Sequence, residues 1–91
     1  MFLHVERCEH VKDYILRVYF NTGEVVEIDL KNELDGPIYE PLRLVEYFKS
    51  FEKNPETNTI EWPNGADFAP EFLLENGKVL AYEDIEPIRS A

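Results

Sequence analysis

The feature of this sequence that most constrains its fold is residues 14–20, where two sets of side chains alternate. The even positions are all apolar or aromatic: Tyr14, Leu16, Val18 and Phe20. The odd positions between them are Ile15, Arg17 and Tyr19. A period of two is typical of a β-strand with one buried face. Asn21-Thr22-Gly23 predicts a turn, and residues 25–30 then return as a second strand whose even positions face the core.

A third strand precedes this hairpin. Residues 2–9 are interpreted as a strand with Leu3 and Val5 on one side, and the polar residues 10–13 as the turn that follows it. The three strands form an antiparallel β-meander. No long crossover precedes residue 41, which argues against a doubly wound nucleotide-binding fold.

The period changes to that of a helix over residues 41–51. Pro41 suits the first helical position, and apolar side chains then recur at helical spacing: Leu44, Val45, Phe48 and Phe51. Lys49 and Lys53 lie near the expected C-terminal end, where the helix dipole favours cations. Asn54-Pro55-Glu56 is expected to end this main amphipathic helix.

The rest of the chain predicts smaller elements. Residues 58–62 form a short strand, residues 70–75 a short second helix that Asn76-Gly77 ends, and residues 79–82 a late strand before a loose tail at 83–91. The predicted fold class is α+β, an antiparallel β-meander sheet with both helices packed on one face. We expect a single domain over residues 1–78 and a C-terminal extension over 79–91.

Composition narrows the functional classes. The 91 residues carry nine Lys/Arg against nineteen Asp/Glu, a formal net charge of −10. This excess opposes direct binding to nucleic acid and favours a basic partner. The only cysteine, Cys8, cannot form an internal disulfide, no apolar run is long enough to span a membrane, and the N-terminus lacks a secretory signal. We therefore expect a cytoplasmic protein.

Three segments, in this order, resemble the DUF2442 family of small bacterial proteins, a domain of unknown function. They are residues 14–24 with Asp29-Leu30, the Tyr39-Glu40-Pro41-Leu42 helix start, and residues 59–67, which contain Trp62-Pro63-Asn64-Gly65-Ala66-Asp67. The resemblance covers residues 5–75 and is most specific at 59–67. It implies an α+β sheet-and-helix fold and no established catalytic residues.

The resemblance also implies a biological setting. Some longer members carry a helix-turn-helix domain after this one, and some are encoded beside a second small protein in pairs that resemble toxin–antitoxin modules. The present sequence ends at Ala91 and leaves no room for a helix-turn-helix, so we expect no direct binding to DNA.

Metal and nucleophile chemistry have little support in the sequence. His4, Cys8 and His10 share one side of an ideal strand, but residues 4 and 10 would lie about 20 Å apart, so we expect no metal site. The serines lie at a helix end and in the tail, far in sequence from both histidines, and the four glycines are scattered. We predict no cofactor, and no enzyme.

One pair of carboxylates needs separate consideration. Glu61 and Asp67 bracket a turn beside Trp62, and paired carboxylates can perform acid–base chemistry when an aromatic ring desolvates one of them. The simpler interpretation makes the segment structural, with Asp67 binding local backbone N–H groups. We therefore interpret the signature residues as mainly structural: Trp62, Pro63, Asn64, Gly65 and Asp67.

The best candidate for a contact surface is the odd face of the 14–20 strand. Ile15, Arg17 and Tyr19 lie opposite the expected core, and exposed aromatic and arginine side chains often anchor protein interfaces. The alternative is that a thin two-layer domain simply exposes the edges of its aromatic rings.

These observations favour a noncatalytic protein-interaction or regulatory module, antitoxin-like, that binds a small basic protein. A homodimer is also left open, because a small meander exposes edge strands. One alternative is an accessory transcriptional regulator that acts with a DNA-binding partner. A less favoured alternative is a small hydrolase that uses Glu61 and Asp67.

Overall fold

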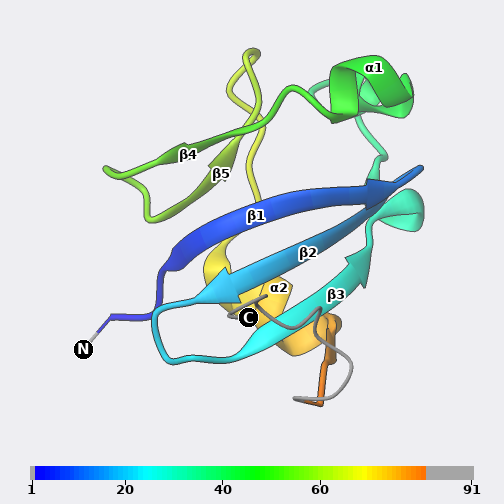
Figure 1. The fold of residues 1–91 in the computed structure, drawn as a ribbon. Helices are drawn as coiled ribbons and strands as arrows, with labels where there is room; N and C mark the ends of the chain where they lie inside the picture. Colours follow the sequence, from blue (N-terminus) through cyan, green and yellow to red (C-terminus); the bar gives the residue numbers. More distant parts are fainter. Residues whose placement is uncertain (1, 82–91) are drawn as a thin grey trace, which may run out of the picture.

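The hairpin at residues 14–30 is the centre of a four-stranded antiparallel sheet. In the computed structural model, which describes residues 2–81, the strand order is β1-β2-β3-β6 (Figure 1). The strands span Val5–Lys12 (β1), Ile15–Phe20 (β2), Val25–Asp29 (β3) and Lys78–Val79 (β6). Val26, Ile28 and Leu30 are buried, so the even face of the return strand looks inward as predicted.

The first strand lies later in the chain than expected. β1 runs to Lys12, so the prediction of a turn at residues 10–13 is wrong, and the turn is confined to Asp13 and Tyr14. Asp13 makes this tight turn at a φ of 46°. The pairing of β1 with β2 contains two register shifts, between Val5 and Arg7 and between His10 and Lys12. Each shift is a β-bulge, which lets the polar residues 10–12 continue the strand.

The continuous helix predicted over residues 41–51 is wrong. A 3₁₀ helix, η2 (Glu40–Arg43), is followed by one short α-helix, α1 (Val45–Phe48). Between them Leu44 is extended, at φ −86° and ψ 120°, and 70% exposed rather than in the core. The carbonyl of Arg43 accepts a hydrogen bond from the Tyr14 hydroxyl. This tertiary contact holds the chain at the break.

A second sheet follows α1. It pairs β4 (Glu52–Asn54) with β5 (Thr59–Glu61), so Lys53 lies in a strand and not at a helix end. The strand at β5 was predicted and its partner was not. In the connecting turn, the Asn54 carbonyl accepts from the backbone N–H of Asn58, whose φ is +64°. The backbone N–H of Val5 binds the Asn58 carbonyl at 2.9 Å, which ties this hairpin to β1.

The second helix agrees closely with the sequence. α2 spans Pro70–Asn76, begins with a proline and lies behind the large sheet in Figure 1. A short 3₁₀ turn, η1 (Lys31–Glu33), follows β3. The late strand predicted at residues 79–82 is shorter and begins one residue earlier: β6 covers only Lys78–Val79, Val79 pairs with Val26, and residues 80–81 lie outside the strand. The loose tail predicted at residues 83–91, together with Tyr82, lies outside the described residues.

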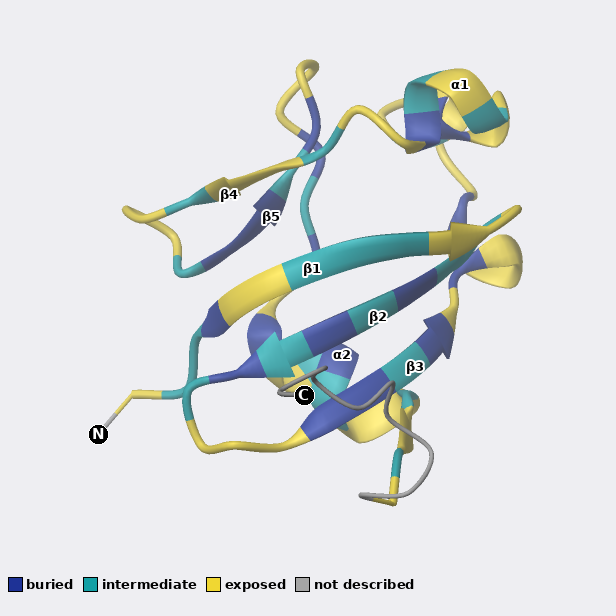
Figure 2. Cartoon of the chain, viewed as in Figure 1, coloured by how far each residue is buried: buried dark blue, intermediate teal, exposed yellow. Residues whose placement is uncertain are grey.

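One hydrophobic core joins these elements. The inner face of the large sheet, which carries Leu16 and Val18, packs against Phe48, Trp62 and Leu73 from α1, the segment after β5, and α2. Figure 2 shows the alternation along β2 between buried and partly exposed residues. The α+β fold class is therefore confirmed. Within residues 2–81, no helix has the length and apolar character needed to cross a membrane.

Candidate functional site

The candidate contact residues Ile15, Arg17 and Tyr19 lie together on one side of the large sheet. Their strand neighbours extend this surface, which we call the outer sheet face. Its members are Arg7, Glu9, Lys12, Ile15, Arg17, Tyr19, Val25, Glu27, Asp29 and Lys78. The core cluster draws on the opposite, inner face. The outer sheet face is turned toward the viewer in Figure 1, with α2 behind the sheet.

Arg17 lies near the middle of the outer sheet face. Its Nη2 donates to Glu27 Oε2 at 3.1 Å, and this hydrogen bond raises the pKa of the Arg17 guanidinium above its ordinary value. The Nε atom of Arg17 is buried and makes no hydrogen bond to any part of the chain that the structure describes. Buried donors are normally satisfied, so this N–H is an exception within the described fold.

Tyr19 connects Arg17 to the β1 side of the outer sheet face. The guanidinium carbon of Arg7 lies 4.1 Å from the centre of the Tyr19 ring, which is cation–π geometry. The Tyr19 hydroxyl donates to Glu9 Oε1 at 3.1 Å, and Arg7 Nη1 donates to Glu9 Oε2 at 2.9 Å. The three side chains thus hold one another in place on the surface.

The charge of this face differs from that of the rest of the molecule. Residues 2–81 contain sixteen acidic residues and eight Lys/Arg. The outer sheet face carries three of those acids and four of those cations. The remaining described surface therefore has thirteen acids and only four cations, a formal charge of −9 against +1 on the outer sheet face.

The signature segment at Trp62 connects three parts of the chain. Trp62 is 2% exposed, and its Nε1 donates to the Phe48 carbonyl at 2.7 Å, which fixes α1. Its ring packs near Phe48, Phe51 and Phe68. The hydrophobic ring and its N–H are thus both used inside the fold.

The turn after Trp62 is held by Asn64. Asn64 Nδ2 donates to the Ile38 carbonyl at 2.8 Å, and its Oδ1 accepts from the Ala66 backbone N–H at 3.1 Å. Gly65 has a φ of +90°, a conformation that other residues rarely adopt. Pro63 is exposed at the start of this turn. These contacts attach the loop before η2 to the turn.

The two candidate acid–base residues lie on adjacent chain segments. Glu61 and Asp67 are partners in an isolated antiparallel bridge. The Glu61 carboxylate accepts a 2.7 Å hydrogen bond from Asn54 on β4. The Asp67 carbonyl accepts from the Tyr39 hydroxyl at 2.9 Å. Burial raises the pKa of Tyr39, and the negative charge of Asp67 raises it further.

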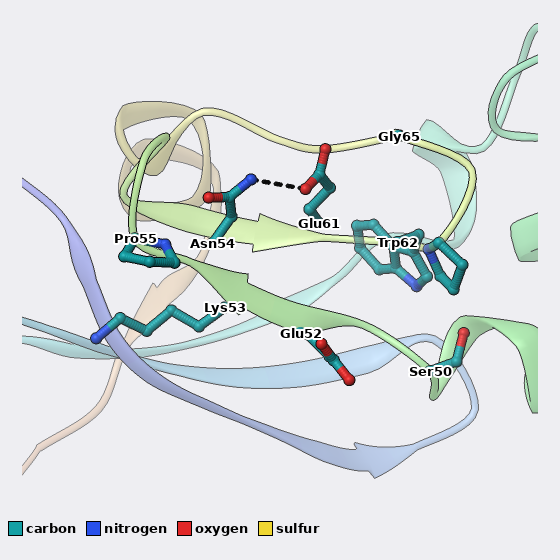
Figure 3. Close-up of a pocket in the computed structure, with 9 residues that line it drawn as sticks. Ser50, Glu52, Lys53, Asn54, Pro55, Glu61, Trp62 and Gly65 are labelled. Carbon is teal, nitrogen blue, oxygen red and sulfur yellow. Dashed lines mark hydrogen bonds between the residues drawn. The ribbon is translucent and has the colours of Figure 1, made fainter.

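A surface hollow of about 490 Å³ adjoins the β4–β5 hairpin. Its lining comes from α1's C-terminal end, both strands of the hairpin and the Trp62 turn: Ser50, Glu52, Lys53, Asn54, Pro55, Glu61, Trp62, Pro63 and Gly65. Figure 3 shows Asn54 reaching across to Glu61 along one side of it. Glu52 and Glu61 are direct cross-strand partners. The hollow is therefore polar and acidic at one edge.

His4, Cys8 and His10 each have separate surroundings. The His4 ring contacts Glu6 at 2.8 Å, and the His10 ring contacts the Asp13 carbonyl at 2.8 Å. Burial, followed by the charge of Glu9, raises the pKa of Cys8 to about 12. Among the residues that the structure describes, no three His, Cys, Asp or Glu side chains are grouped for a metal ion.

The fold and these surfaces define a small α+β domain with one charged, mixed-sign sheet face. The chain matches the family described as "Protein of unknown function (DUF2442)" over residues 5–79. This match spans most of the sequence, so the protein belongs to the DUF2442 family. No curated protein and no solved structure matches the chain.

The sequence predicted the residues of the outer sheet face that lie on β2, and it did not predict those on the neighbouring strands. Glu9, Glu27 and Lys78 lie in one row with Arg17, which only the strand register reveals. Opposite charges at matching positions of predicted neighbouring strands are the signal that could have located Glu27. Lys78 gave no such signal, because its two-residue strand follows α2 directly.

Proposed function

We propose that this protein is a cytoplasmic, noncatalytic interaction module, antitoxin-like, that binds a small basic protein. The observation that carries the proposal is the separation of charge over the surface. Among residues 2–81, those outside the outer sheet face include thirteen acids and four cations, and their formal charge is −9. A field of one sign attracts an oppositely charged partner and raises the rate of encounter.

Two further features support binding rather than catalysis. The signature residues Trp62 and Asn64 use their polar atoms on backbone groups of the same chain. Glu61 is hydrogen-bonded to Asn54, which gives this carboxylate a structural partner within the hairpin. The acidic surface that remains is suited to electrostatic recognition.

Affinity capture tests the proposal. The tagged full chain is used as bait in a lysate of its own host, at low and at physiological salt, and captured proteins are identified by mass spectrometry. We expect one small basic protein in stoichiometric amount, with an association rate that falls as salt rises. Capture of the bait alone would contradict the proposal.

Charge variants make the test specific. Glu56 and Glu75 are both exposed, on the β4–β5 turn and on α2, away from the outer sheet face. The double reversal E56K/E75K should weaken binding of the captured protein, and E56D/E75D, which keeps both charges, should not. Equal binding by both variants at every salt concentration would remove the electrostatic basis of the proposal.

A further inference from the structure

We propose that the outer sheet face binds the same face of a second copy of this chain, forming a two-fold symmetric dimer. The proposal comes from one row of charged residues that crosses all four strands. Glu9 pairs with Arg17, Arg17 with Glu27, and Glu27 with Lys78 in the strand register. The charges along the row therefore alternate negative, positive, negative, positive.

This row is complementary to itself over its full length under one two-fold symmetry. A two-fold axis that lies between the two sheets, parallel to the strands and midway between β2 and β3, exchanges β2 with β3 and β1 with β6. Arg17 of each copy then faces Glu27 of the other, and Glu9 of each copy faces Lys78 of the other. Sheets that pack face to face lie about 10 Å apart, with strand directions within about 30°, which keeps these partners aligned.

An axis that coincides with a strand brings like charges together. An axis that lies along β2 would place Arg17 against Arg17 and Glu9 against Glu27. Like charges that face each other across an interface penalise the wrong arrangement. An axis between β1 and β2, or between β3 and β6, also pairs opposite charges but engages only two residues of each row. The axis midway between β2 and β3 pairs all four with an opposite charge, and a closed two-fold dimer is the commonest symmetric assembly.

The charge of the whole molecule explains why a second copy would use this face. The rest of the described surface has a formal charge of −9, so two copies repel each other there. The outer sheet face has a formal charge of +1 and permits close approach. Ile15 and Tyr19 are partly exposed on it and provide apolar contact area.

Arg17 supplies a second, independent observation. Its Nη2 is bonded to Glu27 of its own chain, but its buried Nε has no hydrogen-bond partner within the described part of the chain. In the proposed dimer a carboxylate of the second copy faces this guanidinium. Arginine commonly binds a carboxylate through two N–H groups at once, so this guanidinium can bind the second copy's carboxylate through Nε once its side chain turns that atom toward the interface.

Sedimentation equilibrium of the full chain, from micromolar to millimolar concentration, tests the dimer. We expect a monomer–dimer equilibrium. E9K places a new lysine against Lys78 of the other copy, and K78E places a new glutamate against Glu9, so each variant alone should dimerise at least about tenfold more weakly. An equimolar mixture of E9K and K78E allows a heterodimer with fewer like-charge contacts than either variant alone, and it should associate more readily than each variant by itself.

Two controls keep the result interpretable. E56K changes the net charge as E9K does but lies on the β4–β5 turn, so its dimerisation should equal that of the natural chain. The central pair provides an independent version of the test, because R17E and E27R should each dimerise more weakly alone and should associate more readily when mixed. Circular dichroism establishes that each variant is folded before it is used.

Two results would overturn the proposal. The first is a natural chain that stays monomeric over the whole range. The second is a dimer that E9K and K78E weaken no more than E56K does. A mixture of E9K and K78E that associates no more readily than each variant alone has the same meaning.

Discussion

The Trp62 segment and the outer sheet face use polar groups in opposite ways. In the Trp62 segment, polar contacts join residues far apart in sequence, as when Trp62 Nε1 binds the Phe48 carbonyl and Asn64 Nδ2 binds the Ile38 carbonyl. On the outer side, Arg7, Glu9 and Tyr19 bind one another on adjacent strands. The first arrangement holds the fold together, and the second orders side chains on a surface.

This difference changes the meaning of the most distinctive sequence motif. Trp62, Asn64 and Gly65 are the residues that make the segment recognisable, yet their contacts are internal to the chain. Arg17 and its row belong to an ordinary strand, yet they leave a buried donor unused. A family signature therefore marks what the fold requires, and it need not mark what binds.

Removing the Trp62 side chain should have the largest effect. Trp62→Ala leaves a cavity among Phe48, Phe51 and Phe68 and is expected to lower the free energy of unfolding by about 3–5 kcal/mol in urea denaturation. Tyr19→Ala on the outer sheet face should cost only about 1 kcal/mol. Equal losses for the two variants would contradict the distinction between the Trp62 segment and the outer sheet face.

Asn64→Ala should have an intermediate effect. It removes the hydrogen bond to Ile38 and the one from Ala66, and these two contacts together are worth about 1–2 kcal/mol of unfolding free energy. Asn76→Ala, which removes a single exposed bond to the Phe72 carbonyl, is the matched control and should cost less. Thermal and urea denaturation both measure the difference. An Asn64→Ala chain as stable as the control would show that the turn does not depend on this amide.

Cys8 gives a prediction on the pH dependence of stability. Its pKa is raised from 9.0 to about 12 because burial disfavours the thiolate, so above pH 9 the unfolded chain loses this proton and the native chain keeps it. The free energy of unfolding should therefore fall as pH rises from 9 toward 12, by at most about 1.4 kcal/mol per pH unit from this group. Cys8→Ala should show a shallower fall over the same range, and identical slopes would refute the assignment.

Arg17→Met should have the smallest effect on stability. A partly exposed ion pair contributes little, so we expect a change within about 1 kcal/mol in the free energy of unfolding. Dimerisation of the same variant should weaken at least about tenfold in sedimentation equilibrium. A loss of stability as large as that of Trp62→Ala would place Arg17 among the residues that hold the fold.

Much of the large sheet could be predicted from local patterns. The period of two over residues 14–20 was enough to place Leu16 and Val18 inside and Arg17 and Tyr19 outside. The short helix at residues 70–76 was also predictable, because Pro70 and Gly77 mark its two ends. In each case the signal and the structure lie within the same few residues.

The parts that were missed depend on contacts across the chain. The apolar spacing over residues 41–51 suits a helix, but the Tyr14 hydroxyl binds the carbonyl of Arg43 at the break between η2 and α1. β4 has only three residues and shows no alternation of its own. In an uninterrupted strand Val5 and Cys8 would point to opposite sides. The bulge between Val5 and Arg7 brings both to the same side of β1.

The bulges of β1 have a consequence for how copies of this protein meet. A straight, exposed strand edge presents evenly spaced N–H and C=O groups on which further strands can add without limit. Two interruptions within eight residues break that spacing and twist the edge, so β1 is a poor template for such growth. Irregularity in a single strand thus disfavours strand addition at the β1 edge, which fits the proposal that copies of this chain meet through a sheet face.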